Sequence, residues 1–202
     1  SLKKIFLKTK LNYKLYLFYN LFIRHKCYLK RAQYSQWGED KHIFEFFKNK
    51  NHGIYLDIGC FHPFMYSNTC LLHRKGWQGI NIDINPTSID LFNIVRPKDI
   101  NLCTTISEKK EVFSIFYDDP FSPVNTLDKK FYENLKDDFF KDRKKLTVES
   151  KSIKEILEIS KIDKNIDFIN IDVEGMDYKI LKKIKLSQLK PKLIAIETQN
   201  VD

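Results

Sequence analysis

The chain of 202 residues contains only four cysteines, and their spacing shows no metal-binding or redox motif. No Cys-x-x-Cys pair occurs, and no histidine-rich segment accompanies Cys27, Cys60, Cys70 or Cys103. A chain of this size can bury a hydrophobic core without disulfide cross-links. The cysteines therefore predict reduced thiols in a cytoplasmic protein, and they argue against a zinc site.

Glycine is also scarce, with six residues in the chain, and the glycine motifs of phosphate-binding loops are absent. There is neither a Gly-x-Gly-x-x-Gly sequence nor a Walker motif with its lysine. Glycines in such motifs let backbone N–H groups approach a pyrophosphate closely. Their absence argues against a dinucleotide ligand.

Acidic residues are absent from residues 1–31, which nevertheless contain nine lysines and arginines. These nine account for the whole net charge of +9, so the rest of the chain is electrically balanced. A nucleic-acid-binding domain normally carries a basic face. We therefore expect no nucleic-acid partner for the main part of the protein.

The N-terminal segment, residues 1–33, lacks an apolar run long enough to cross a bilayer, which requires about 20 residues. Its apolar segments Leu15–Tyr19 and Leu21–Ile23 are short and flanked by basic residues. This pattern predicts a helical leader that lies at an anionic membrane surface, as a peripheral protein at the inner face. Alternatively, the helix packs on the rest of the protein or on a second copy in a homodimer.

Two short β-branched runs each end in an acid and a glycine. Ile54–Pro63 has the sequence Ile-Tyr-Leu-Asp-Ile-Gly-Cys-Phe-His-Pro, and Ile166–Gly175 has Ile-Asp-Phe-Ile-Asn-Ile-Asp-Val-Glu-Gly. Such runs are typical of buried parallel strands that deliver polar side chains to the carboxyl edge of a sheet. In open α/β sheets, ligands bind at this edge.

Strand and helix patterns alternate along residues 34–202, which we interpret as one Rossmann-like domain. Strands are predicted at Ile54–Ile58, Gly79–Ile84, Ile100–Ile106, Val112–Tyr117 (an edge strand), Ile166–Ile171 and Leu193–Glu197. Helices are predicted at Lys41–Lys50, Ser67–Lys75 with Ser67 as its cap, Thr87–Val95, Lys129–Lys145, Ser152–Ser160 and Asp177–Ile184. This alternation predicts an α/β fold with a mostly parallel sheet and helices on both faces.

An acid–glycine pair and a second acid predict a nucleoside site. Asp57 and Gly59 offer a carboxylate and close backbone approach. Asp83 follows about 25 residues later at the end of the next strand, where a Rossmann-type site holds ribose hydroxyls. Because the phosphate-binding glycines are missing, S-adenosylmethionine is favoured over NAD as the ligand.

Several blocks of the sequence, from about Tyr34 to the C-terminus, resemble the FkbM-type methyltransferases. They are Ser35-Gln36-x-Gly38-Glu39-Asp40, Asp57-Ile-Gly59-x-x-His62-Pro63-x-x-x-Ser67-Asn68-Thr69, Gly76-Trp77-x-Gly79-Ile-Asn-Ile-Asp83, Asn125-Thr126-Leu127-Asp128, Ile171-Asp172-Val173-Glu174-Gly175-Met-Asp177 and Pro191-Lys-Leu-Ile-Ala-Ile-Glu197. The resemblance implies a class I, S-adenosylmethionine-dependent methyltransferase fold. It also implies methyl transfer to an oxygen of a small molecule or glycan.

The resemblance also implies cofactor contacts at individual positions. Asp57 and Gly59 would line the methionine and ribose end, and Asp83 would hold the ribose. Ser67 and Asn68 would lie at a helix amino end, where N–H groups favour a carboxylate. The remaining implied contacts come from Gln36 and Asp40, which would close over the cofactor, and from Thr104, Thr105, Ile106 and Ser107 around the adenine.

The methyl acceptor requires a base, because a sugar hydroxyl is a poor nucleophile until its proton is withdrawn. Asp172 and Glu174 are the first candidates, followed by His62 and then Glu197. A packing role competes for His62, and a helix-capping role competes for Glu174. We predict no metal site, the alternative being Mg²⁺ held by Asp172 and Glu174.

The family sheet continues past Glu197 with a helix and a strand hairpin, so we expect the C-terminal strands to be missing from this chain. The sequence predicts a cytoplasmic O-methyltransferase that uses S-adenosylmethionine. Its acceptor would be a sugar hydroxyl of a surface glycan or glycolipid, or a secondary metabolite. The alternatives are an NAD-dependent oxidoreductase and a non-catalytic Rossmann-like ligand-binding module.

Overall fold

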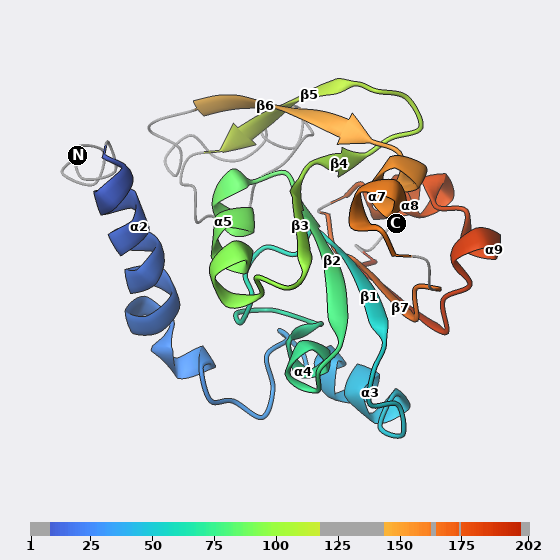
Figure 1. The fold of residues 1–202 in the computed structure, drawn as a ribbon, viewed down its shortest axis with the longest axis horizontal. Helices are drawn as coiled ribbons and strands as arrows, with labels where there is room; N and C mark the ends of the chain where they lie inside the picture. Colours follow the sequence, from blue (N-terminus) through green and yellow to red (C-terminus); the bar gives the residue numbers. More distant parts are fainter. Residues whose placement is uncertain (1–8, 118–143, 163–164, 174, 199–202) are drawn as a thin grey trace.

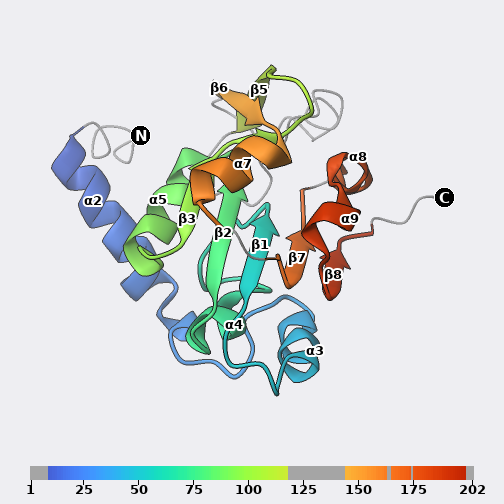
Figure 2. The same cartoon turned by 45° about the vertical axis from the view of Figure 1, so that its right-hand side comes forward.

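The computed structural model describes residues 9–117, 144–162, 165–173 and 175–198. Their centre is a five-stranded parallel sheet with the order β3-β2-β1-β7-β8, shown in Figure 1 and, with β8 labelled, in Figure 2. The strands are β1 (Ile54–Ile58), β2 (Gln78–Asp83), β3 (Ile100–Cys103), β7 (Phe168–Ile171) and β8 (Leu193–Ile196). The predicted α/β fold with a parallel sheet is therefore confirmed.

The strand order reverses at β1, which places the two acid–glycine runs side by side. The chain moves outward from β1 to β3 and later returns to form β7 on the other side of β1. In this register Asp57 lies opposite Asn81 of β2 and Asn170 of β7. The ligand-binding edge of such a sheet lies outside the carboxyl ends of the strands at this reversal.

Alternate residues of the central strands give the sheet two different faces. The aliphatic face carries Leu56 and Ile169, and it is covered by α7 (Ile153–Ser160) and α8 (Asp177–Lys183) through a cluster of buried isoleucines. The other face carries Tyr55 and Phe168, which pack against Ile43, Phe47, Leu72 and Trp77. These last residues belong to α3 (Glu39–Phe46), α4 (Cys70–Arg74) and the segments that follow them.

A smaller, three-stranded sheet lies beside the main one, and it differs from the sequence prediction in one strand. Its order is β4-β6-β5, formed by β4 (Thr105–Ile106), β5 (Val112–Tyr117) and β6 (Lys144–Lys151). The predicted strand Ile100–Ile106 is broken at Thr104, whose hydroxyl donates to the Glu149 carbonyl at 2.6 Å. β5 is an edge strand, as expected.

The predicted helix Lys129–Lys145 is wrong at its last two residues, which lie in β6. The rest of that prediction, like the Asn125–Asp128 block, lies outside the described residues. β6 pairs antiparallel with β5 over six residue pairs, and this pairing outweighs the helical charge pattern of the segment.

Several helix boundaries also differ from the sequence prediction. α3 ends at Phe46 rather than Lys50, and α4 begins at Cys70 with Thr69 as its N-cap residue rather than Ser67. Ser67 lies two residues before this N-cap position, and its hydroxyl accepts a hydrogen bond from Arg96. A short helix, α9 (Leu186–Leu189), was not predicted.

The leader packs on the domain through α2 (Lys10–Tyr19) and the π-helical turn η1 (Asn20–Arg24), as Figure 2 shows beside α5 (Pro86–Val95). Leu17 and Leu21 are buried in a cluster with Leu91 of α5. The Tyr13 hydroxyl donates to Asp90 at 2.7 Å. The leader helix therefore packs on the rest of the protein, and this contact uses only one side of the helix.

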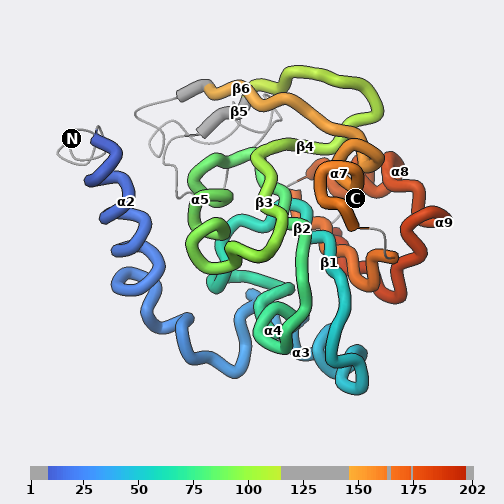
Figure 3. Tube along the Cα trace, viewed as in Figure 1, coloured from blue at the N-terminus to red at the C-terminus, as the bar shows by residue number. Residues whose placement is uncertain are grey.

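The chain continues from the leader through the 3₁₀ turn η2 (Lys26–Tyr28) to α3, a path that Figure 3 follows. Within the described ranges, no helix combines the length and apolar character needed to cross a membrane.

Leu21→Ala tests the packing of the leader on α5. Leu21 is fully buried, so we expect the free energy of unfolding to fall by about 2–5 kcal/mol in urea denaturation. Leu15→Ala is the matched control, because Leu15 lies on α2, the helix directly before η1, with 54% of its surface exposed, and it should change little. Equal effects of the two substitutions would contradict this packing.

Gly59→Ala tests the turn that follows β1. Gly59 has φ +80°, and a Cβ there would overlap the Asp172 carbonyl oxygen. We expect a loss of about 3 kcal/mol in unfolding free energy, from left-handed strain plus the clash. Gly38→Ala is the control, since its φ is +100° but its Cβ would meet only the Gln33 side chain at 3.6 Å. Strain alone should cost that variant about 1 kcal/mol, and similar losses in both would rule out the backbone contact.

Candidate functional site

A cavity of about 130 Å³ lies at the carboxyl ends of β1, β2 and β7. Its wall combines polar side chains with apolar ones such as Ile58, Ile82 and Val173. Most of the residues predicted for the site lie in this wall: Gln36, Asp57, Gly59, Ser67, Asn68, Asp83, Thr104, Thr105, Asp172 and Glu197. The structure therefore brings together residues that are widely separated in the sequence.

Asp83 ends β2 and lies almost fully buried at this cavity. One carboxylate oxygen accepts from the Phe61 N–H at 2.8 Å, and the other accepts from the Asn85 N–H at 2.7 Å. A third backbone hydrogen bond, from Ile84, also acts on this carboxylate. A carboxylate has about four acceptor positions, so one remains for a ligand.

Burial raises the pKa of Asp83 from its ordinary value to about 6, against the opposing effect of its backbone hydrogen bonds. A carboxyl group with a raised pKa favours the fold most when it is protonated. This contribution is complete below about pH 4, and it is lost as the pH rises through 6. The protein therefore holds a destabilising carboxylate at the cavity at neutral pH.

Asp57 is the centre of a chain of side-chain hydrogen bonds beneath the cavity. Its carboxylate accepts from the Thr69 hydroxyl at 2.6 Å and from the Asn170 amide at 2.9 Å. The Asn170 carbonyl in turn accepts from the Asn68 amide at 2.9 Å. Burial raises the pKa of Asp57, and the bonds from Thr69 and Asn170 counteract part of that effect.

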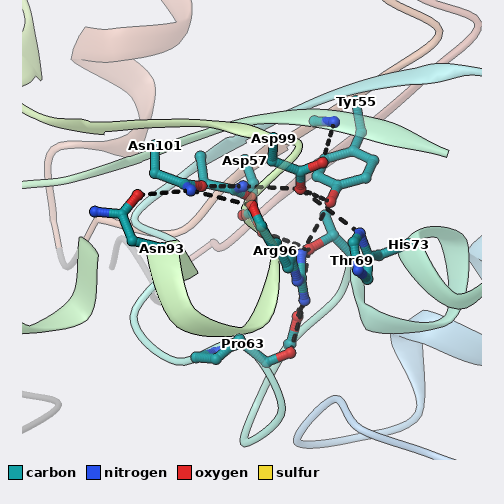
Figure 4. Close-up of polar contacts among 12 residues, drawn as sticks. Tyr55, Asp57, Pro63, Thr69, His73, Asn93, Arg96, Asp99 and Asn101 are labelled. Carbon is teal, nitrogen blue, oxygen red and sulfur yellow. Dashed lines mark hydrogen bonds and ion pairs between the residues drawn. The ribbon is translucent and has the colours of Figure 1, made fainter. Parts of the chain in front are cut away.

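Arg96, which no sequence pattern marked, follows α5 and has no exposed surface. Figure 4 shows its side chain extending beside Thr69 toward Pro63. It donates to the Thr69 hydroxyl at 2.9 Å and to the Pro63 carbonyl at 2.6 Å. A further bond to the Ser67 hydroxyl, at 3.2 Å, ties the whole Pro63–Thr69 loop to the end of α5.

Charge balance holds Arg96 in its ionised form. Burial works to lower the pKa of Arg96, but the surrounding Tyr55, Cys70, Asp57 and Asp99 outweigh it, so that the pKa is raised. The Tyr55 hydroxyl connects Arg96 to Asp99, because it accepts from the Arg96 guanidinium at 3.1 Å and donates to the Asp99 carboxylate at 2.5 Å.

Three predicted cofactor contacts lie outside the cavity wall, and one of them, Ile106, is buried in the aliphatic core cluster. Asp40 is buried in the first turn of α3, where it accepts from the Tyr34 N–H and the Ser35 hydroxyl, both at 2.6 Å. Ser107 donates to Glu111 at 2.5 Å and lies beyond the cavity wall. The side chains of Asp40 and Ser107 are therefore engaged in local hydrogen bonds outside the cavity wall.

His62 is also not placed to act as the base. Its Nδ1 atom accepts from the Phe64 and Met65 N–H groups at 3.1 and 3.0 Å, and its Nε2 atom faces Asn20 at 3.2 Å. Burial, with help from His25, lowers the pKa of His62 to about 3. The imidazole is therefore neutral with both nitrogens engaged, and the packing alternative describes it correctly.

Asp172 directly follows β7 and contributes to the cavity wall. Glu197, the fourth candidate base, lies in the same wall. Glu174 lies outside the described residues, so its role stays a prediction. In the part of the chain that the structure describes, no group of three or more His, Cys, Asp or Glu side chains is arranged to hold a metal.

Two aromatic residues of the cavity wall have strained backbone conformations. Phe61 has φ 48° and Tyr66 has φ 58°, both in the left-handed region. Tyr66 and Gln36 also line an adjoining open hollow of about 380 Å³, which Tyr28 and Arg31 of the leader help to form. The ring of Tyr28 meets that of Tyr66 edge-on at 6.3 Å.

The comparisons with known proteins identify the domain that forms this site. The family model of the methyltransferase FkbM domain matches residues 50–202, which include every strand of both sheets. No match was found among curated proteins or among solved structures. The matched segment covers most of the chain and carries the buried acids at the carboxyl ends of β1 and β2, so the protein belongs to the FkbM methyltransferase family.

Proposed function

We propose that the protein uses S-adenosylmethionine to methylate a sugar hydroxyl of a glycan, glycolipid or secondary metabolite. It would act in the cytoplasm, and at the inner face of the membrane where the acceptor is a glycolipid. The observation that carries the proposal is the buried carboxylate of Asp83 at the cavity, at the position where class I folds bind ribose hydroxyls.

The residues of the cavity fit an adenosine-containing methyl donor. Gly59 permits close approach of the backbone, and Asp83 retains an acceptor position for a ribose hydroxyl beside its three backbone hydrogen bonds. Ile82, Ile84 and Val173 give the cavity apolar wall residues suited to an adenine ring. Ser67 and Asn68 add polar groups to the wall, where the amino-acid end would lie.

When bound, S-adenosylmethionine supplies a methyl group activated by a sulfonium. The main task of the protein is then to hold an acceptor oxygen in line with that methyl group. We assign the removal of the acceptor's proton to the Asp172 carboxylate, which lies in the cavity wall. Glu174 stays the second candidate.

The hollow beside the cavity supports a sugar as the acceptor. Tyr28 and Tyr66 offer aromatic surface for the C–H faces of a sugar ring, while Gln36 and Arg31 offer donors for its oxygens. Gln36 and Tyr66 line both spaces, so an acceptor in the hollow would reach into the cavity between them.

The NAD-dependent oxidoreductase and the non-catalytic module are the competing proposals. The turn after β1 contains a single glycine and no loop that could wrap a pyrophosphate, which disfavours NAD. The positions of Asp172 and Glu197 in the cavity wall favour an enzyme over a binding module, because neither is needed to bind adenosine.

Calorimetric titration with S-adenosylhomocysteine, S-adenosylmethionine and NAD tests the cofactor. We expect both adenosyl ligands to bind, and Asp83→Ala to weaken their binding about 10- to 100-fold, the value of one or two charged hydrogen bonds. Glu45→Ala, an exposed acid on α3, is the control and should bind as the wild type does. Binding of NAD alone would overturn the proposal in favour of the oxidoreductase.

Binding of S-adenosylhomocysteine should also depend on pH through Asp83. Ribose hydroxyls prefer the ionised carboxylate, and the pKa of about 6 means that this form is lost as the pH falls below 6. We expect the affinity to fall by up to about tenfold per pH unit in that range. Asp83→Asn should show no such slope, and parallel profiles for wild type and variant would exclude Asp83 as the titrating ligand.

A further inference from the structure

The leader helix α2 has a second apolar face, on the side away from the domain. Leu11, Leu15, Phe18 and, in η1, Ile23 expose between 54% and 68% of their surface. Leu11, Leu15 and Phe18 follow the i, i+4, i+7 spacing of one helix face. The Phe18 ring is tilted against that of Phe22, with centroids 4.5 Å apart, and Phe22 in turn packs on the inner cluster.

This outer face is not required for folding of the leader on the domain. Contacts with the domain are made by the inner side of the helix, through Tyr13, Leu17 and Leu21. Among the described residues, Figures 1 and 2 show the body of the protein on the inner side of α2 only. An apolar face of this kind indicates an interaction with a second surface.

The charge around the outer face is of one sign. Lys10, Lys14, Arg24, Lys26 and Lys30 are all exposed, and residues 1–31 contain no acid. The nearby acid of α5, Asp90, accepts a hydrogen bond from Tyr13 on the inner side of the helix. The outer face is therefore an apolar strip bordered by exposed positive charge.

We propose that this face of α2 and η1 docks on an anionic lipid bilayer. Leu11, Leu15, Phe18 and Ile23 would enter the headgroup region, and the exposed lysines and arginine would contact anionic lipid phosphates and carboxylates. A second copy of the chain is a poorer occupant, because a symmetric contact would bring the two basic borders together. The inference does not depend on the methyl donor or acceptor.

Co-sedimentation with lipid vesicles tests the proposal on the full chain. One vesicle preparation contains phosphatidylcholine with about 30% phosphatidylserine, and the other contains phosphatidylcholine alone. We expect binding to the anionic vesicles, weakened by high salt, and weak binding to the neutral ones. The double substitution Leu15→Ser with Phe18→Ser should weaken binding about tenfold or more.

A matched variant separates this face from general surface hydrophobicity. Ile94→Ser removes an equally apolar residue with 43% exposure on α5, and it should bind vesicles as the wild type does. Thermal unfolding of each variant shows that the leader still packs on the domain. Equal binding by all three proteins would overturn the proposal, as would wild-type self-association in light scattering that the double substitution abolishes.

Discussion

The buried hydrogen-bond network beside the central strands depends on one positive charge, the guanidinium of Arg96. Two carboxylates, Asp57 and Asp99, are buried in the same region, and isolated charges in a protein interior are very unfavourable. Arg96 offsets them through Thr69 and Tyr55 rather than by direct contact. The same guanidinium also holds the Pro63–Thr69 loop. The position of this loop at the site and the balance of buried charge therefore depend on the same residue.

Stability and the proposed activity oppose one another at Asp83. Burial raises the pKa of this residue to about 6, so its ionised form costs folding free energy at neutral pH. The aliphatic face of the sheet, with its buried isoleucines under α7 and α8, supplies compensating stability on the opposite side. A site that binds hydroxyl groups with a carboxylate can retain this cost only on such a scaffold.

The sheet and much of its ligand-binding edge could be predicted from sequence because their signals are local. A short, continuous apolar run that ends in Asp-x-Gly places Asp57 and Gly59 by itself, and the next strand places Asp83 at its own end. Arg96 was missed because its partners lie 27 to 41 residues away, and no local pattern marks a buried arginine. Asp40 and His62 were misplaced because each side chain accepts hydrogen bonds from backbone N–H groups within six residues of it, which motif spacing alone does not reveal.

The leader is connected to the site through α5, on which it packs. α2 packs on α5 through Leu17, Leu21 and Leu91, and Arg96 caps the carboxyl end of α5. A protein shortened to begin after the leader would expose the side of α5 that carries Leu91, although α5 would keep its contacts with β2 and β3. The match to the family model begins at residue 50, yet the buried contacts of Leu17 and Leu21 with Leu91 cross that boundary, so the hydrophobic packing of the domain extends beyond the matched segment.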